Sequence, residues 1–339
     1  MTQKDDISIS VCISVKNGQE HINQCLESIL NQTLKTIEII IVNNGSTDET
    51  PNIIKEYEIK FPLKIRIFNQ ENKGLALGRQ RGISEAKGRY VAFLDVDDYL
   101  KPHALEKLYA YAIHHQVDIV EFKTLKGDEI IGSGYKGTHN TRDILKDYFL
   151  LGQIPSMLWL RLYNRAVFEK QVLPEIYVNN EDIFAFPCLL YAAQSILFVD
   201  EQLHSYTVDN SDSVMYRIKN SNVSQEKILK NRIKTLMVVN HIREFIGVEK
   251  IDTEFSEEFK AFSARTVLNF CLQSYNLTSK DKLVKLVEDT TNIKLKELKP
   301  TFKKLIHYNK YIQYSTNLLG FQTTFILYRL LKKTSTLNT

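Results

Sequence analysis

Short apolar strand patterns alternate with helical patterns through the first 95 residues, and this alternation constrains the fold more than any other feature. Strand-like runs cover residues 7–15, 37–42, 64–68 and 89–95, and helical spacing covers 20–32, 50–60 and 75–87. Repeated strand–helix–strand units build parallel sheets with helices packed on both faces. The sequence therefore predicts an α/β fold with a Rossmann-like, mostly parallel sheet flanked by helices.

The pattern changes in the second half of the chain. Further helices are expected at 102–115 and 181–194, strands at 117–122 and 196–200, a Gly-rich loop at 127–140 and an apolar stretch of mixed pattern at 157–168. After about Met215, Gly and Pro become rare and helical patterns follow one another. We predict one domain at 1–217, with halves 1–100 and 101–217, followed by a helical C-terminal region at 218–339.

The fourth predicted strand, in VAFLDVDDYLKP, ends in three acids, Asp95, Asp97 and Asp98. Burying such a cluster without a partner is costly, so either water or a cation must compensate it. In an extended segment, Asp95 and Asp97 point to the same side. Carboxylates suit Mg²⁺ and Mn²⁺, which reach nucleotides through one or two of them plus phosphate oxygens. Ligands of parallel sheets bind at the carboxyl ends of the strands, where these acids lie.

Two other strand ends carry polar residues. Asn43 and Asn44 precede Gly45, a pattern typical of a tight turn that also suits contacts with a base and ribose. The run NKGLALGRQRG follows the third strand, and its glycines allow close backbone approach. Its Arg79 is placed to face a diphosphate, or else is a solvated surface residue.

These motifs together resemble family 2 glycosyltransferases with the GT-A fold, of the type that builds bacterial cell-surface polysaccharides. The resemblance is carried by SISVCISVKNGQEHINQCLESILNQTLKTIEIIIVNNGSTDET and NKGLALGRQRGISEAKGRYVAFLDVDDYL, and it continues to about Met215 through LWLRLYNRAVF, NNEDIFAFPCLL and VDEQLHSYTVDNSDSVM. It implies an inverting hexosyltransferase that uses a nucleotide-sugar donor, a divalent metal (Mn²⁺ or Mg²⁺) at D-x-D, and a glycan or lipid-linked acceptor.

The resemblance also implies roles for individual residues. Asp182 is expected to be the general base with Glu181 in support, although acids in a first helical turn also favour the helix dipole. Apart from the resemblance, Trp159 is expected to offer a ring to the acceptor, with core packing as the alternative. His204 is expected to contact the metal with Asp97 and Asp95, or a phosphate, with a structural role as the alternative. The donor is expected to bind at Ser14, Val15, Asn17, Asn44, Asn72, Gly74, Arg79, Asp95 and Val96.

This chain departs from the family pattern at two places. Lys16 stands where the family commonly has Tyr, and Asn43 and Asn44 stand where it has an Asp pair, the second of which accepts from uracil N3–H. Asn44 still offers an acceptor oxygen, so UDP is the expected nucleotide, with another pyrimidine left open. The alternatives are a non-catalytic sugar-nucleotide-binding protein and a D-x-D phosphatase. The phosphatase pattern needs Thr or Val where Tyr99 stands, and it follows the first strand.

Charge and composition limit the partners. The net charge of +4 over 339 residues does not indicate nucleic-acid binding. The first residues lack a signal-peptide core, no apolar run spans a bilayer, and the four scattered cysteines suit reduced thiols, so a cytoplasmic protein is expected. From Asn292 onward, lysines mix with Tyr, Phe, Leu and Ile, a pattern that is compatible with peripheral contact with the inner face of the membrane. The alternatives for this tail are a solvated helical domain or a homo-oligomer contact.

Overall fold

The chain divides into two compact units. The structure, a computed structural model, describes residues 7–170, 172–174, 180–207, 224–274, 277–293, 297–298 and 301. The first unit comprises residues 1–145 and 153–221, and the second comprises residues 146–152 and 222–339. The predicted boundary at 217/218 and the basic tail beyond 301 lie outside the described residues.

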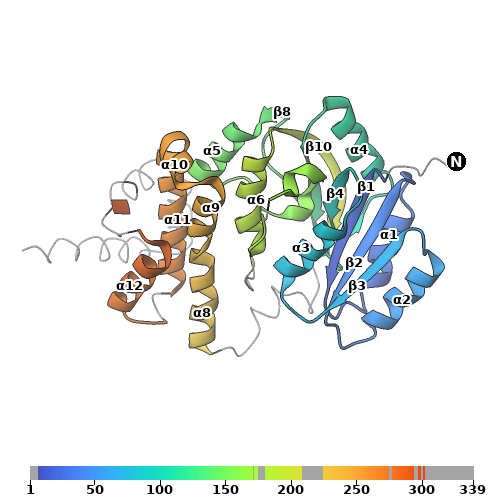
Figure 1. The fold of residues 1–339 in the computed structure, drawn as a ribbon, viewed down its shortest axis with the longest axis horizontal. Coiled ribbons are helices and arrows are strands. Elements are labelled where there is room, and N and C mark those ends of the chain that lie inside the picture. The colour runs from blue at the N-terminus through green and yellow to red at the C-terminus, as the bar shows by residue number, and fades with distance from the viewer. Residues whose placement is uncertain are drawn as a thin grey trace, which may run out of the picture. The chain divides into compact units, whose positions relative to one another are not determined.

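The first unit is built on one sheet of ten described strands (Figure 1). The strands are β1 (Ile9–Val15), β2 (Ile37–Asn44), β3 (Ile65–Gln70), β4 (Tyr90–Phe93), β5 (Tyr99–Leu100), β6 (Ile119–Lys126), β7 (Glu129–Ile131), β8 (Gly137–Asn140), β9 (Arg161–Asn164) and β10 (Ser195–Tyr206). Their order is β3-β2-β1-β4-β9-β6-β10-β5, with β7 on β6 and β8 on β10. The block β3-β2-β1-β4 is parallel, as is β6 with β10, and β9 runs antiparallel between the two blocks.

Helices lie on both faces of the parallel block. The helices from α1 to α6 are α1 (Ile22–Leu30), α2 (Thr50–Lys60), α3 (Leu75–Glu85), α4 (Ala104–His115), α5 (Thr141–Leu151) and α6 (Glu181–Ala192), and the 3₁₀ turns are η1 (Leu158–Leu160) and η2 (Arg165–Phe168). Alternate β1 residues, such as Val11 and Ile13, join a buried core with α1, α2 and α4. Cys12 and Ser14 alternate with these residues and face α3. This helix lies on the other side of the strands from α1 and α2 (Figure 1). Because successive strand residues point to opposite faces, this arrangement buries every residue of β1 except Ser14, which is half-buried.

The predicted fold class is confirmed, since the sheet is mostly parallel and flanked by helices. The prediction was wrong for one segment and left another without an assigned structure. The loop expected at 127–140 contains strands β7 and β8, and the mixed stretch at 157–168 contains β9 between two 3₁₀ turns. Both differences involve strands of three or four residues, which are too short to display a period.

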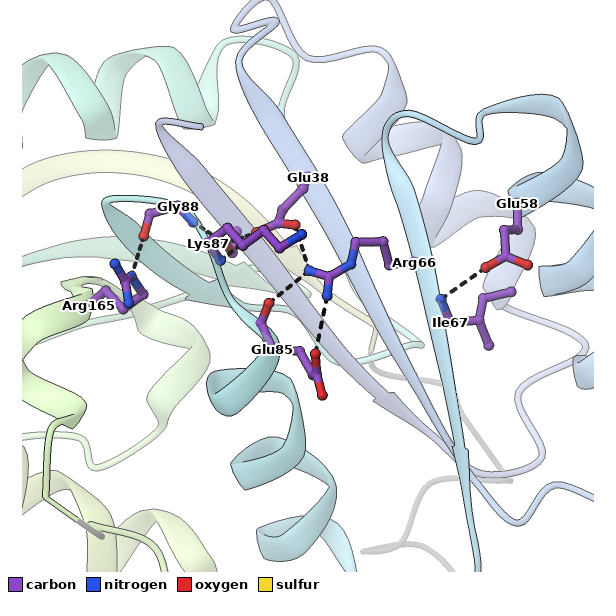
Figure 2. Close-up of polar contacts among 9 residues, drawn as sticks. Glu38, Glu58, Arg66, Ile67, Glu85, Lys87, Gly88 and Arg165 are labelled. Atoms are coloured by element: carbon purple, nitrogen blue, oxygen red, sulfur yellow. Dashed lines mark hydrogen bonds and ion pairs between the residues drawn. The ribbon is translucent and has the colours of Figure 1, made fainter. Parts of the chain in front are cut away.

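A buried polar cluster fixes the amino ends of the parallel strands (Figure 2). Glu38 of β2 accepts hydrogen bonds from the Ser10 hydroxyl at 2.6 Å, from the Lys87 backbone N–H at 2.7 Å and from Arg66 Nη1 at 3.1 Å. Gly88 lies so close to β1 that a methyl group there would lie 2.5 Å from the Ser10 nitrogen. These bonds satisfy a carboxylate that would otherwise be costly to bury. The cluster serves the fold at the end of the sheet opposite the candidate site.

The second unit is helical in its described part. It contains α8 (Gln225–Leu236), α9 (Val238–Ile246), α10 (Val248–Glu254), α11 (Ser256–Ser274) and α12 (Lys280–Thr291). Phe149, from the end of α5, packs against the rings of Phe255, Phe259 and Phe262 at centroid distances of 5.3 to 6.0 Å. Arg265 of α11 donates to backbone carbonyls at the end of α5, which suits the negative pole of that helix. These contacts explain why residues 146–152 belong to the second unit.

Two expectations about the environment of the chain can be compared with the structure. All four cysteines are buried and none forms a disulfide, and burial raises the pKa of the Cys12 thiol. Among the helices in the described part of the chain, none has both the length and the apolar character needed to cross a bilayer.

Candidate active site

The predicted site residues gather at the carboxyl ends of β1, β2 and β4. The D-x-D motif follows β4 in a tight turn and not in the extended segment that the sequence suggested. The Asp98 N–H donates to the Asp95 carbonyl at 3.0 Å, which closes this turn. The three acids differ in their exposure to solvent. Asp95 and Asp97 remain partly exposed, whereas Asp98 is buried.

Arg79 connects the D-x-D turn to the acid pair of α6. Its Nη2 donates to Asp95 Oδ1 at 2.8 Å, and its Nη1 donates to Asp182 Oδ1 at 2.7 Å and to Glu181 Oε1. The guanidinium is only 3% exposed and lies 5.7 Å from the centroid of the Phe93 ring. Burial alone would lower the pKa of Arg79, but the three carboxylates outweigh it and raise that pKa. Of the two sequence interpretations of Arg79, the solvated surface residue is excluded.

Helix α3 brings Arg79 to this position because its glycines let it pack directly on β1. Gly74 precedes the helix with φ of +89°, a conformation that side chains rarely adopt. A methyl group at Gly78 would lie 2.0 Å from Ser14 Oγ, so only hydrogen fits there. Ser14, which was predicted at the donor, is thus half-buried under α3.

The two acids at the start of α6 differ in their surroundings. The Glu181 side chain is 3% exposed and the Asp182 side chain is 20% exposed, so Asp182 is the acid that solvent reaches. Burial raises the pKa of both carboxyls, and Arg79 opposes this rise. A backbone hydrogen bond from Leu158 of η1 also favours the ionised form of Asp182 and lowers its pKa. The pair can therefore hold or accept a proton at higher pH than ordinary carboxylates.

The third acid of the turn, Asp98, pairs with His204 of β10. Asp98 Oδ2 lies 3.4 Å from His204 Nε2, and Asp98 Oδ1 accepts from the Thr207 N–H at 3.0 Å. The Thr124 hydroxyl donates to the His204 carbonyl at 3.1 Å and lies 2.6 Å from Nδ1. Burial raises the pKa of Asp98 to about 6, partly opposed by His204.

These contacts revise two predictions about aromatic residues. His204 was expected at the metal beside Asp97, but it is fully buried and its Nε2 faces Asp98. Trp159 was expected to offer a ring to the acceptor. It is 5% exposed, and its ring stacks on His204 at a centroid distance of 4.7 Å. The structure therefore favours the packing alternative for Trp159, since one ring face is already covered.

The end of β2 is arranged differently from the prediction. Asn44 Oδ1 accepts from Gln70 Nε2 at 3.0 Å and from the Lys73 N–H at 3.2 Å, which fills both acceptor positions of this oxygen. Asn44 Nδ2 donates to the Gly74 carbonyl at 3.0 Å, which an Asp could not do. The expected direct contact with uracil is thus not supported by the geometry. Asn44 instead fixes the segment that contains Asn72 and Gly74.

The other predicted donor residues line the same edge of the sheet. Asn17 has φ of +55°, and its Oδ1 accepts from the Thr47 N–H at 2.8 Å, which joins the ends of β1 and β2. Val15 and Val96 approach Gly18 so closely that a methyl group there would lie 2.8 Å from each. The tip of β1 thereby packs against the D-x-D turn.

The chemistry of the D-x-D turn fits a divalent cation that is shared with a phosphate ligand. Asp95 and Asp97 offer carboxylate oxygens, the ligands that Mg²⁺ and Mn²⁺ prefer. Within the described residues, no group of three or more His, Cys, Asp or Glu side chains is arranged to hold a metal ion. Two carboxylates completed by phosphate oxygens and water are the coordination expected for Mg²⁺ beside a nucleotide. The residues present therefore suit a cation that binds together with a diphosphate.

Three contributors to the site were not singled out from the sequence. Leu158 acts through its backbone amide, Thr124 lies on another strand, and Asp98 was noted only as a third acid. The contact between Arg79 and Glu181 joins residues 102 positions apart, so no local pattern reveals it. For Asp98, the sequence offered one signal, a third acid after D-x-D that needs either solvent or a partner to compensate its charge.

Comparisons with known proteins agree with this geometry. A family model described as "Glycosyl transferase family 2" matches residues 10–171. The putative glycosyltransferase EpsH of Bacillus subtilis (strain 168) is 32% identical over 226 residues, which cover 61% of this chain and 62% of EpsH. The chain thus spans less than two thirds of that relative's length.

Solved structures show the same fold at low sequence identity. Residues 1–349 of Staphylococcus aureus TarS, in complex with UDP-GlcNAc, give a TM-score of 0.56 at 17% identity and cover 88% of this chain and 92% of that one. The mannosyltransferase PcManGT from Pyrobaculum calidifontis, in complex with GDP-Man and Mn²⁺, gives 0.50 at 14% identity and covers 94% and 84%. Residues 10–171 thus match the model of glycosyl transferase family 2, and the solved structures share the fold of this chain.

Proposed function

We propose that the protein is an inverting, metal-dependent glycosyltransferase that moves a sugar from a nucleotide-sugar donor to a hydroxyl of a glycan or lipid-linked acceptor of the cell surface. The observation that carries this proposal is the Arg79 bridge, which joins Asp95 of D-x-D to the acid pair Glu181–Asp182. A diphosphate site and a proton acceptor are thereby held next to each other. UDP-sugars are the first candidates for the donor.

In the proposed reaction Asp182 is the general base. It is the more exposed acid of the pair, and its carboxylate is oriented by Arg79 Nη1 at 2.7 Å. The acceptor hydroxyl gives its proton to Asp182 as its oxygen bonds to the anomeric carbon. The bond from that carbon to the diphosphate oxygen breaks on the opposite face, so the configuration inverts. Positioned proton transfer of this kind contributes about 10²- to 10⁴-fold to the rate.

The remaining residues of the site hold the reacting groups. Asp95 and Asp97 are the residues that would hold a divalent cation, which, when bound, stabilises the charge on the departing diphosphate. Glu181 is buried against Arg79, and both Glu181 and Asp182 pair with the positive charge of Arg79. Asn44 holds the segment of Asn72 and Gly74 at the edge where the nucleotide is proposed to lie.

Three measurements test the proposal. Purified protein is incubated with UDP-GlcNAc, UDP-glucose, UDP-galactose or GDP-mannose, with and without MnCl₂, and release of the nucleoside diphosphate is followed. Asp182→Asn should abolish turnover and leave donor affinity, measured by calorimetry, nearly intact. Asp97→Asn should weaken donor binding only when metal is present. Binding of donor by wild-type protein without turnover would favour the non-catalytic alternative, and metal-independent binding that Asp97→Asn does not change would remove Asp97 from the site.

A further inference from the structure

Arg161, the first residue of β9, is a fully buried cation near the acid pair. Its Nη1 donates to the Met157 carbonyl at 2.9 Å, and its Nη2 donates to the Pro155 carbonyl at 2.5 Å and to the carboxylate of Glu121 on β6. Both Arg161 and Glu121 are at most 2% exposed. A buried charge is costly unless it is paired and hydrogen-bonded, and the two terminal nitrogens of Arg161 have one carboxylate and two carbonyl acceptors, while its Nε has no hydrogen-bond partner among the described residues.

The same guanidinium contacts helix α6. Its Cζ lies 3.7 Å from the centroid of the Phe186 ring. Phe186 is four residues after Asp182, so the two side chains project from the same side of α6, one turn apart. Arg161 thus packs against the helix that carries the proposed base, one turn along from that base.

Arg161 also reaches the other support of Asp182. The Met157 carbonyl and the Leu158 N–H belong to one peptide group, so fixing the carbonyl orients the amide. That amide is the one that interacts with the carboxylate of Asp182. One buried side chain therefore contacts both Phe186, on the helix that carries Asp182, and the peptide group whose N–H interacts with Asp182.

We infer that Arg161 is a positioning residue for Asp182, which clamps residues 155–158 against α6 and thereby sets the direction of the base toward the acceptor. The inference rests on the proposed function, because it assigns Arg161 a role in proton transfer. An arginine suits this task, since its planar fork reaches two carbonyls, a carboxylate and an aromatic face at once, which an ammonium group cannot do. Displacement of a reacting group by about 1 Å costs on the order of 10²-fold in rate.

A purely stabilising role for the Arg161–Glu121 pair predicts different behaviour, and two variants separate the two roles. Arg161→Lys keeps the buried charge but loses the planar fork. Glu121→Gln removes the charge partner but leaves Arg161 its carbonyls and Phe186. If Arg161 positions the base, Arg161→Lys should lower kcat about 10- to 100-fold with donor KM within about threefold. Glu121→Gln should lower the melting temperature and leave kcat within about threefold.

The chain supplies a matched control in the same segment. Arg165 is exposed and donates its Nε to the Gly88 carbonyl at 2.9 Å, at the opposite end of the sheet (Figure 2). Arg165→Lys makes the same chemical change to an arginine–carbonyl contact that involves neither Glu121 nor Phe186. Its kcat should equal that of wild type.

The experiment measures UDP release by the full-length protein with the UDP-sugar that wild type turns over fastest, in MnCl₂. Calorimetric stoichiometry for that UDP-sugar counts folded sites, so kcat is expressed per binding site. Should Arg161→Lys fail to fold, Phe186→Leu removes the ring contact while the buried ion pair stays intact, and it should lower kcat per site in the same way. Wild-type kcat per site in the folded variant, or kcat losses in Glu121→Gln as large as in Arg161→Lys, would overturn the inference. Absence of turnover by wild type would instead contradict the proposed function.

Discussion

Replacing Arg79 with methionine tests whether one guanidinium balances three acids. The substitution removes the hydrogen bonds to Asp95, Glu181 and Asp182 and leaves Glu181 buried beside another carboxylate. Removing one partner of a buried ion pair costs about 3–5 kcal/mol, because the remaining charge is uncompensated. We therefore expect the free energy of unfolding at pH 8 to fall by about that amount.

The loss should depend on pH in a defined direction. Without Arg79, the pKa values of Glu181 and Asp182, already raised by burial, rise further. A carboxyl whose pKa is raised in the folded state binds its proton more tightly there, so its contribution to stability is lost as the pH rises through the folded pKa. The difference between wild type and Arg79→Met should therefore be small at pH 5 and grow toward pH 8.

Urea unfolding at the two pH values measures this difference, and Trp159, the one tryptophan of the chain, is a buried fluorescence reporter in the first unit. The control is Arg81→Met, two residues along the same helix. Arg81 pairs with Glu85 at 2.9 Å but is 49% exposed, so its loss should cost at most about 0.5 kcal/mol at either pH. An Arg79→Met penalty below about 1 kcal/mol, or one equal at pH 5 and pH 8, would refute the reasoning.

Three further predictions concern single contacts. Gly78→Ala places a methyl group 2.0 Å from Ser14 Oγ and should lower the free energy of unfolding by about 1–3 kcal/mol in urea titrations, more than an added methyl costs at an open surface position. Leu158→Pro removes the amide that lowers the pKa of Asp182, so the acid limb of the kcat–pH profile should move to higher pH. The control is Leu158→Ala, which keeps the amide, and coincident profiles of the two variants would exclude the contact. Glu38→Gln weakens a buried acceptor of three hydrogen bonds and should cost about 1–3 kcal/mol in urea unfolding with unchanged kcat, since the cluster lies away from the site.

The sequence predicted the parallel half of the fold because each strand there is long enough to show its pattern. Residues 7–95 alternate between strand and helix, and polar residues mark three strand ends at the edge where parallel sheets bind ligands. The same reasoning failed for β9, whose four residues lie between two 3₁₀ turns. No periodic pattern is visible over so few residues.

The details of the site depended on contacts between distant residues. Arg79 was predicted to face a diphosphate, yet its partners in the structure include two acids more than 100 positions away. Asn44 was expected to accept from a base, but its oxygen is used by Gln70 and Lys73 on the neighbouring segment. Residue type identified the chemistry that these side chains can perform. Only the packing of the chain decides which partner each one meets.

The antiparallel strand β9 divides the sheet into two parallel blocks, and this division bears on how such enzymes can be recombined. The block that ends in D-x-D contributes Arg79, and the second half of the unit contributes Glu181 and Asp182. A chimera that exchanges residues 101–207 for those of a relative would join a new acid pair to the Arg79 and D-x-D turn of this chain. We expect such a chimera to be active only if the new segment carries acids that can pair with Arg79, as Glu181 and Asp182 do in this chain. Charge complementarity at Arg79 is therefore a criterion for choosing which relatives to combine.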